Sequence, residues 1–190
     1  AGITSANRPI TVVSWFRAAR FANWMHNGQP VGDEDESTTE AGAYSLNGAT
    51  SGVAPARNSD AKYYLPNTNE WYKAAYYSPV KSGSGAPGYW YYATQSDVAP
   101  GNQMGSLPNQ ANFYYGHYAA GSYCVTGINF YQSAQNYLTD VGSFTNSASY
   151  YGTFDQNGNV YQWTDLDGTP SQLRGFPGGS WNTEGRFDLM

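Results

Sequence analysis

Residues 63–77 read YYLPNTNEWYKAAYY, and this stretch carries the start and stop signals of a helix. Asn67 is followed three residues later by Glu70, a capping-box pattern in which each side chain satisfies a free backbone N–H at the helix N-terminus. Trp71 begins the apolar side. Pro79 ends the helix, because proline cannot continue it. The stretch therefore predicts a helix anchored by a tryptophan.

Towards the N-terminus, residues 9–28, PITVVSWFRAARFANWMHNG, predict another helix. Ser14 is a natural N-cap, and Asn27-Gly28 ends the helix because glycine tolerates the left-handed C-cap conformation. Residues 10–13 predict a short strand or an extended lead-in. At helical spacing, the apolar side comprises Trp15, Ala18, Ala19, Ala22 and Met25, and the other side Arg17, Arg20, Asn23 and Asn27.

Between the two helices, residues 29–61 form a long insertion that contains the acidic run 32–36, GDEDE. This run lacks the alternating ligand pattern and terminal Glu of an EF-hand, so we interpret it as a solvated surface loop. From residue 80 onward the helical period disappears. Short aromatic segments alternate there with Gly, Pro, Asn and Ser turns, which is typical of loop-rich β structure.

The composition limits the classes of partner. The 190 residues are enough for one domain with a core. A net charge of −5, with nine scattered Lys and Arg, excludes nucleic acid as a partner. No apolar run approaches the ~20 residues of a membrane span. Low Lys, high Tyr and Ser, and an opening Ala1 in place of Met lead us to expect a secreted or cell-surface bacterial protein.

Two of the chain's motifs lie at the starts of the predicted helices, VVSW (12–15) and LPNTNEW (65–71). Two further motifs follow in the sequence, GNVYQW (158–163) and LRGFPGGSW (173–181). In this order they resemble the signatures of the formylglycine-generating-enzyme (sulfatase-modifying factor) family. The resemblance implies an α+β, C-type-lectin-like fold that is loop-rich, with two helices and a small antiparallel sheet. It also implies strands before Ala1 and after Met190, so we expect a single family domain over 1–190 that is incomplete at both ends. We assign the motif tryptophans to the core: Trp15, Trp71, Trp163 and Trp181.

The resemblance implies calcium at two places. In the first, the ligands carried over are the Asp155 side chain, the Gly158 and Val160 carbonyls, and Gln162, which replaces the family's Glu. Hard oxygen ligands in a loop suit calcium. The alternative is a metal-free turn of the same shape, with Asp155 capping backbone N–H groups.

The second calcium site would begin with the Asn112 side chain and the Phe113 carbonyl. Its downstream acid has no clear counterpart, and both Asn129 and Asp140 remain candidates.

Family enzymes oxidise a substrate cysteine with two cysteines that bind copper(I), a soft ion that selects thiolates. Aligned from the GGSW motif, the first falls on Asp188 and the second beyond Met190. A carboxylate cannot replace a thiolate for copper(I), so we predict neither a copper site nor a catalytic residue. Cys124, the chain's one cysteine, is expected to be a small buried hydrophobe.

We interpret the chain as a non-catalytic extracellular recognition or structural module, with a protein, a carbohydrate or further copies of itself as partner. In diversified ligand-binding proteins, variation clusters after the GGSW motif, which would place the ligand-binding face at Asn182, Glu184, Arg186, Phe187 and Asp188. Two alternatives remain. One is a metal-dependent oxidoreductase of the family that acts on a protein cysteine. The other is a subunit completed by strand exchange between chains.

Overall fold

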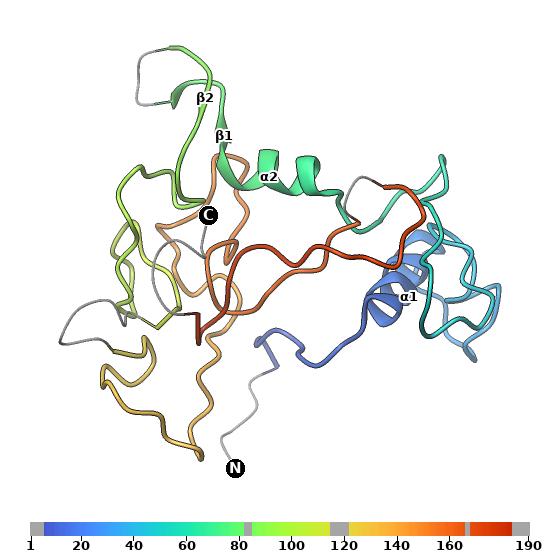
Figure 1. The fold of residues 1–190 in the computed structure, drawn as a ribbon, viewed down its shortest axis with the longest axis horizontal. Coiled ribbons are helices and arrows are strands. Elements are labelled where there is room, and N and C mark those ends of the chain that lie inside the picture. Colours follow the sequence, from blue (N-terminus) through green and yellow to red (C-terminus); the bar gives the residue numbers. More distant parts are fainter. Residues whose placement is uncertain (1–5, 82–84, 115–121, 166–167, 184–190) are drawn as a thin grey trace. The chain divides into compact units, whose positions relative to one another are not determined.

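The structure, a computed structural model, describes residues 6–81, 85–114, 122–165 and 168–183 (Figure 1). The chain forms two compact units. Unit 1 takes the described parts of Ala1–Thr11, Tyr72–Gln162 and Phe176–Met190, and unit 2 takes those of Val12–Trp71 and Trp163–Gly175.

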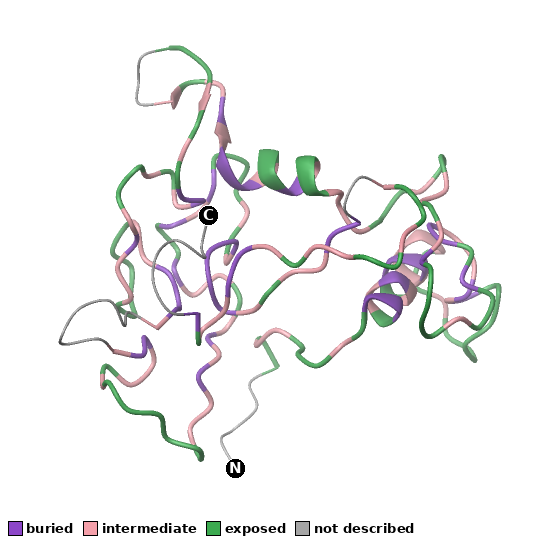
Figure 2. Cartoon of the chain, in the orientation of Figure 1, coloured by how far each residue is buried: buried purple, intermediate pink, exposed green. Residues whose placement is uncertain are grey.

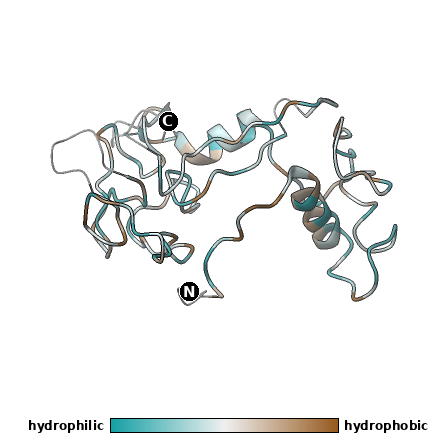
Figure 3. Cartoon of the chain, turned by 60° about the horizontal axis from the view of Figure 1, so that its bottom comes forward, coloured by the Kyte–Doolittle hydropathy of each residue, from teal (hydrophilic) through white to brown (hydrophobic). Residues whose placement is uncertain are grey.

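Helix α1, Trp15–His26, lies in unit 2 and has the predicted caps. The Ser14 hydroxyl accepts a hydrogen bond from the Arg17 N–H at 3.3 Å, and Asn27 is the C-cap. Gly28 follows with φ +84°, the left-handed conformation that glycine adopts at low cost. The helix carries both hydrophobic and hydrophilic residues (Figure 3).

Helix α2, Thr68–Tyr76, starts in the predicted capping box. The Glu70 N–H donates to Asn67 Oδ1 and the Asn67 N–H donates to Glu70 Oε2, both at 2.8 Å. The helix is shorter than residues 63–77, because its N-cap stands after Pro66 and its last turn leads directly into a strand. Trp71 is buried, as predicted.

The predicted polar side of α1 is wrong at Asn23, which is fully buried. Its Nδ2 donates to the carbonyls of Thr39 and Tyr44 at 2.7 and 2.9 Å, and its Oδ1 accepts from the Tyr44 N–H at 2.8 Å. The physical reason is that segment 29–61 covers this side of the helix. The buried amide then satisfies the backbone groups of that segment.

Segment 29–61 is therefore more than a surface loop. Residues 31–37, which include the acidic run, are exposed, as predicted. The rest of the segment supplies half of the unit 2 core, where its side chains pack against those of α1. The core residues of unit 2 are Trp15, Phe16, Ala19, Ala22, Ala43, Tyr44, Leu46 and Ala54.

Unit 1 contains the sheet, formed by β1 (Tyr77–Ser78) and β2 (Gly88–Tyr89). The strands are antiparallel, with Tyr77 opposite Tyr89 and Ser78 opposite Gly88. The other pairings of its described residues are isolated bridges, such as Asn112 with Gly158. Over the described residues, two helices and a small antiparallel sheet confirm the predicted loop-rich α+β class. Among the described residues, no helix is long and apolar enough to cross a membrane.

Candidate functional site

Five aromatic rings of unit 1 form one group, which we call the aromatic cluster. Its members are Tyr114, Tyr123, Tyr131, Tyr137 and Trp181. Tyr123 is the centre, because its ring contacts each of the other four. The Trp181 ring lies 4.8 Å from Tyr137 at an interplanar angle of 10°, and 6.2 Å from Tyr131 at 19°. Such ring pairs stabilise by about 0.5–1.5 kcal/mol beyond the area they bury.

The cluster has a buried side and an exposed side. Tyr123 and Tyr137 are buried, whereas Trp181 is half-buried and Tyr131 is 57% exposed. The inner rings therefore hold the outer ring in place while much of its surface stays in water. The prediction that Trp181 is a core residue holds for only one side of its ring.

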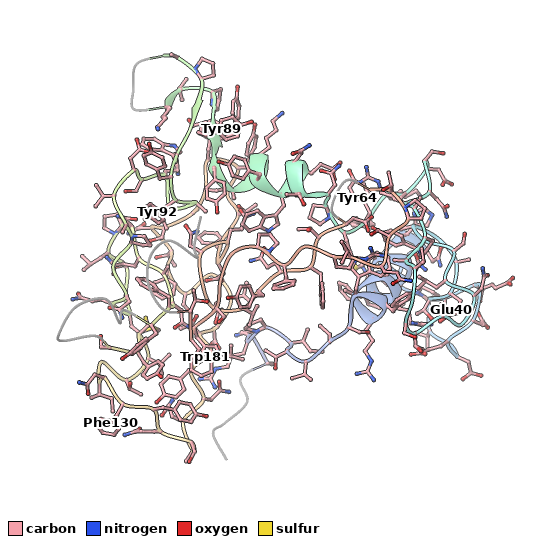
Figure 4. The ribbon with its side chains drawn as sticks, in the orientation of Figure 1. Glu40, Tyr64, Tyr89, Tyr92, Phe130 and Trp181 are labelled. Carbon is pink, nitrogen blue, oxygen red and sulfur yellow. The ribbon has the colours of Figure 1, made fainter. Side chains whose placement is uncertain are left out.

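The exposed side continues along the loop 129–134, NFYQSA, in which every residue is exposed (Figure 2). Phe130, 60% exposed, lies in this loop (Figure 4). The loop is tied to the cluster: the Gln132 N–H donates to the Tyr137 hydroxyl at 2.9 Å, and the Tyr114 hydroxyl donates to the Asn129 carbonyl at 3.4 Å. Large exposed aromatic residues that adjoin one another mark a binding surface more often than isolated ones do.

A pair of buried asparagines holds the backbone of the aromatic cluster through hydrogen bonds. The Asn159 N–H donates to the Asn112 carbonyl at 2.7 Å, and Asn112 Nδ2 donates to Asn159 Oδ1 at 3.2 Å. Asn112 Nδ2 also donates to the Tyr137 carbonyl at 2.8 Å, and the Trp181 N–H donates to the Asn159 carbonyl at 3.0 Å. The backbones of two stacked residues, Tyr137 and Trp181, are thus held by the same pair of asparagines.

Of the predicted ligand-binding residues, the structure places Asn182 beside this cluster. Asn182 is exposed, and its Oδ1 accepts a hydrogen bond from the Tyr123 hydroxyl at 3.4 Å. The other four lie outside the described residues: Glu184, Arg186, Phe187 and Asp188.

Sequence reasoning missed the residues that build the site around Asn182. Asn159 stands inside the GNVYQW motif, so the motif already contained a signal for a buried amide. Tyr131 and Tyr137 come from a stretch with no local pattern. Only long-range folding brings these two residues to Trp181.

At the first proposed calcium position, the structure brings Asp155 and Gln162 into contact. Asp155 Oδ2 accepts from the Gly142 N–H at 2.7 Å, and Gln162 Nε2 donates to the Asp155 carbonyl at 2.8 Å. Gly158 and the half-buried Val160 lie in the loop between these two residues. Burial raises the pKa of Asp155, and the Gly142 N–H offsets this only in part. A cation beside this carboxylate would favour its ionised form.

The residues of the second proposed position also make other contacts. The Asn112 amide belongs to the asparagine pair, and Phe113 is fully buried in the unit 1 core. Asp140 pairs with Arg8, Nε to Oδ1 at 3.7 Å, and the Asn129 carbonyl accepts from Tyr114. In the part of the chain that the structure describes, no three His, Cys, Asp or Glu side chains form a metal-binding group. Calcium there would need carbonyl and amide oxygens in addition to any carboxylate.

Cys124 is buried in unit 1, as expected. Burial raises the pKa of its thiol to about 12, so the thiol stays protonated at neutral pH. A protonated, buried thiol suits neither copper(I) binding nor nucleophilic attack.

Among family models, the one described as the Sulfatase-modifying factor enzyme 1-like domain matches residues 3–187. No curated protein and no solved structure shows a significant match to the chain.

Proposed function

The chain belongs to the sulfatase-modifying factor enzyme 1-like domain family, and we propose that it is a non-catalytic recognition module that binds a protein partner through its aromatic cluster and the loop 129–134. One observation carries this proposal. Tyr131 is stacked on Trp181 and Tyr137 yet leaves more than half of its surface in water. A ring held in this way loses little conformational entropy on binding.

The composition of the surface supports a protein partner. Residues 122–138 contain no Asp, Glu, Lys or Arg. Cores of protein interfaces are depleted in charge and enriched in aromatic residues, and Tyr and Trp dominate their hot spots. The polar neighbours, Asn129, Gln132 and Asn182, supply the adaptable hydrogen bonds that binding loops use.

The cysteine content of the chain supports a non-catalytic role. The position aligned with the first family cysteine is Asp188, and the chain's one cysteine, Cys124, is buried with a raised pKa. These residues do not fit copper(I), a soft ion that selects thiolates.

We also propose three further properties as part of this function: a C-type-lectin-like arrangement of the loops, calcium at Asp155, and a secreted or surface location. The loop-rich α+β architecture supports the first, and the contact of Gln162 with Asp155 supports the second. The low Lys and high Tyr content supports the third.

Random-peptide phage display on the immobilised chain tests the binding surface. Selected peptides should bind Tyr131→Ala at least about tenfold more weakly than wild type, as expected for a hot spot. Tyr63→Ala, which removes a tyrosine of similar exposure from unit 2, is the matched control and should bind as wild type does. Peptides that bind Tyr131→Ala and Phe130→Ala as tightly as they bind wild type would overturn the proposal.

Catalysis is tested separately. The chain is incubated with copper(I), oxygen and a cysteine-containing peptide, and mass spectrometry follows the thiol. We expect the cysteine to stay unconverted. Formation of an aldehyde would favour the oxidoreductase alternative.

A further inference from the structure

Unit 2 contains a cavity of about 950 Å³ that has no part in the site described above. Its size is at the upper end of the range of small-molecule sites, about 300–1,000 Å³. One wall is a single face of α1, since Arg17, Arg20, Phe21 and Trp24 follow one another at spacings of three, one and three residues. The facing wall comes from segment 29–61 and includes Glu34, Thr39 and Glu40.

Arg20 is a fixed hydrogen-bond donor in this cavity. Its Nε donates to Glu40 Oε1 at 2.5 Å, and its Nη2 donates to Glu40 Oε2 at 3.0 Å and to the Ala49 carbonyl at 3.1 Å. Glu40, labelled in Figure 4, also accepts from the Gly48 N–H at 2.7 Å. The two side chains are only 12% and 11% exposed. These bonds hold the guanidinium rigidly, and they leave Nη1 without an acceptor among the described residues.

An aromatic pair stands beside this donor. Phe21 is 62% exposed, and its ring lies 5.7 Å from that of Trp24 at an angle of 31°. Trp24 is itself fixed, because its Nε1 donates to the Pro30 carbonyl at 3.0 Å. The wall therefore presents an apolar ring face next to a rigid polar group.

The charges of the cavity are balanced. Arg20 and Glu40 neutralise each other, and the exposed Arg17 is matched by the exposed Glu34. With balanced charges and the fixed Arg20 donor, the lining suits a neutral ligand that accepts a hydrogen bond.

We infer that this cavity binds a neutral oligosaccharide. A pyranose ring has an apolar C–H face that can cover Phe21, and hydroxyl groups at its edge that can accept a hydrogen bond from Arg20 Nη1. The balanced charges favour neutral over acidic sugars. The wall from α1 has its backbone satisfied within the helix, so it offers a peptide no strand edge to pair with.

The experiment uses the full chain and isothermal titration calorimetry. The probes are neutral oligosaccharides of glucose, mannose, galactose and N-acetylglucosamine, with a uronic-acid oligosaccharide and a short peptide for comparison. We expect at least one neutral probe to bind, with Phe21→Ala weakening its binding by at least about tenfold. Phe21 is largely exposed, so this variant should keep the wild-type melting temperature.

Phe130→Ala is the matched control, because Phe130 is equally exposed but belongs to unit 1. It should bind the sugar as wild type does, which separates this inference from the proposed protein-binding surface. Three results would overturn the inference: no neutral probe binds at millimolar concentration, only the acidic sugar or the peptide binds, or the bound sugar is lost with Phe130→Ala and retained with Phe21→Ala.

Discussion

The carbonyl oxygen of Asn112 occupies the space that a Cβ on Gly158 would need. The two residues are paired by an isolated parallel bridge, and Gly158 has φ +85°, a conformation that favours glycine. The same carbonyl accepts the Asn159 N–H, so the close approach sets up the asparagine pair under the aromatic cluster.

Gly158→Ala should therefore destabilise the protein for two reasons, the positive φ and the clash with backbone. Gly152→Ala is the matched control, since Gly152 has φ +77° but open space where the Cβ would lie. We expect the loss of unfolding free energy at residue 158 to exceed that at residue 152 by at least about 1 kcal/mol. Urea unfolding of both variants measures the difference. Equal losses would contradict the close approach.

The ion pair of Arg20 with Glu40 should contribute more to the free energy of unfolding than that of Arg57 with Glu70. The first pair is 12% and 11% exposed, and the second is 29% and 37% exposed. Arg20→Ala leaves a buried carboxylate without its cation and should cost about 3 kcal/mol. Arg57→Ala should cost about 1 kcal/mol or less. Denaturant unfolding at neutral pH ranks the two variants, and the opposite ranking would count against the burial of the first pair.

The same ion pair gives stability a pH dependence. Burial raises the pKa of Glu40, but the hydrogen bonds from Arg20 and Gly48 and the charge of Arg20 outweigh it, so the folded-state pKa lies below the usual 4.5. A lowered folded-state pKa contributes stability above the unfolded-state pKa and loses it as pH falls through the folded-state value. The stability difference between wild type and Arg20→Ala should therefore shrink below about pH 4.5. Unfolding curves from about pH 7 to pH 3 check this trend, and a difference independent of pH would refute it.

Calcium should act through Asp155. Without the metal, the raised pKa means that ionised Asp155 costs the folded state free energy at neutral pH, and this cost disappears as pH falls. Asp155→Asn should thus be neutral or stabilising in a chelator. Calcium should raise the melting temperature of wild type by mass action and leave Asp155→Asn unchanged.

Asp60→Asn, at an exposed position of unit 2, is the control and should respond to calcium as wild type does. A wild-type melting temperature that is the same in calcium and in chelator would argue for the metal-free turn.

Cys124 should react slowly with iodoacetamide at neutral pH. The residue is only 6% exposed, and burial raises the pKa of its thiol to about 12, so little thiolate is present. Mass spectrometry should show labelling only after denaturant is added. Rapid labelling of the folded chain would contradict both the burial and the assignment of the thiol as inert.

The sequence by itself determined the features that depend on near neighbours. The caps of α1 at Ser14 and α2 at Asn67 join residues three apart, and the stop at Gly28 depends on one backbone conformation. The family followed from the ordered motifs, because each motif is a short contiguous stretch.

Only the tertiary structure decided which polar and aromatic side chains are buried. Asn23 is buried by Thr39 and Tyr44, which lie 16 and 21 residues away in the sequence. Similarly, Asn112 meets Asn159 across 47 residues. The stack of Tyr131 on Trp181 likewise joins distant parts of the chain. Such contacts depend on how loops without a local period fold back on one another, and that information is spread over the whole chain.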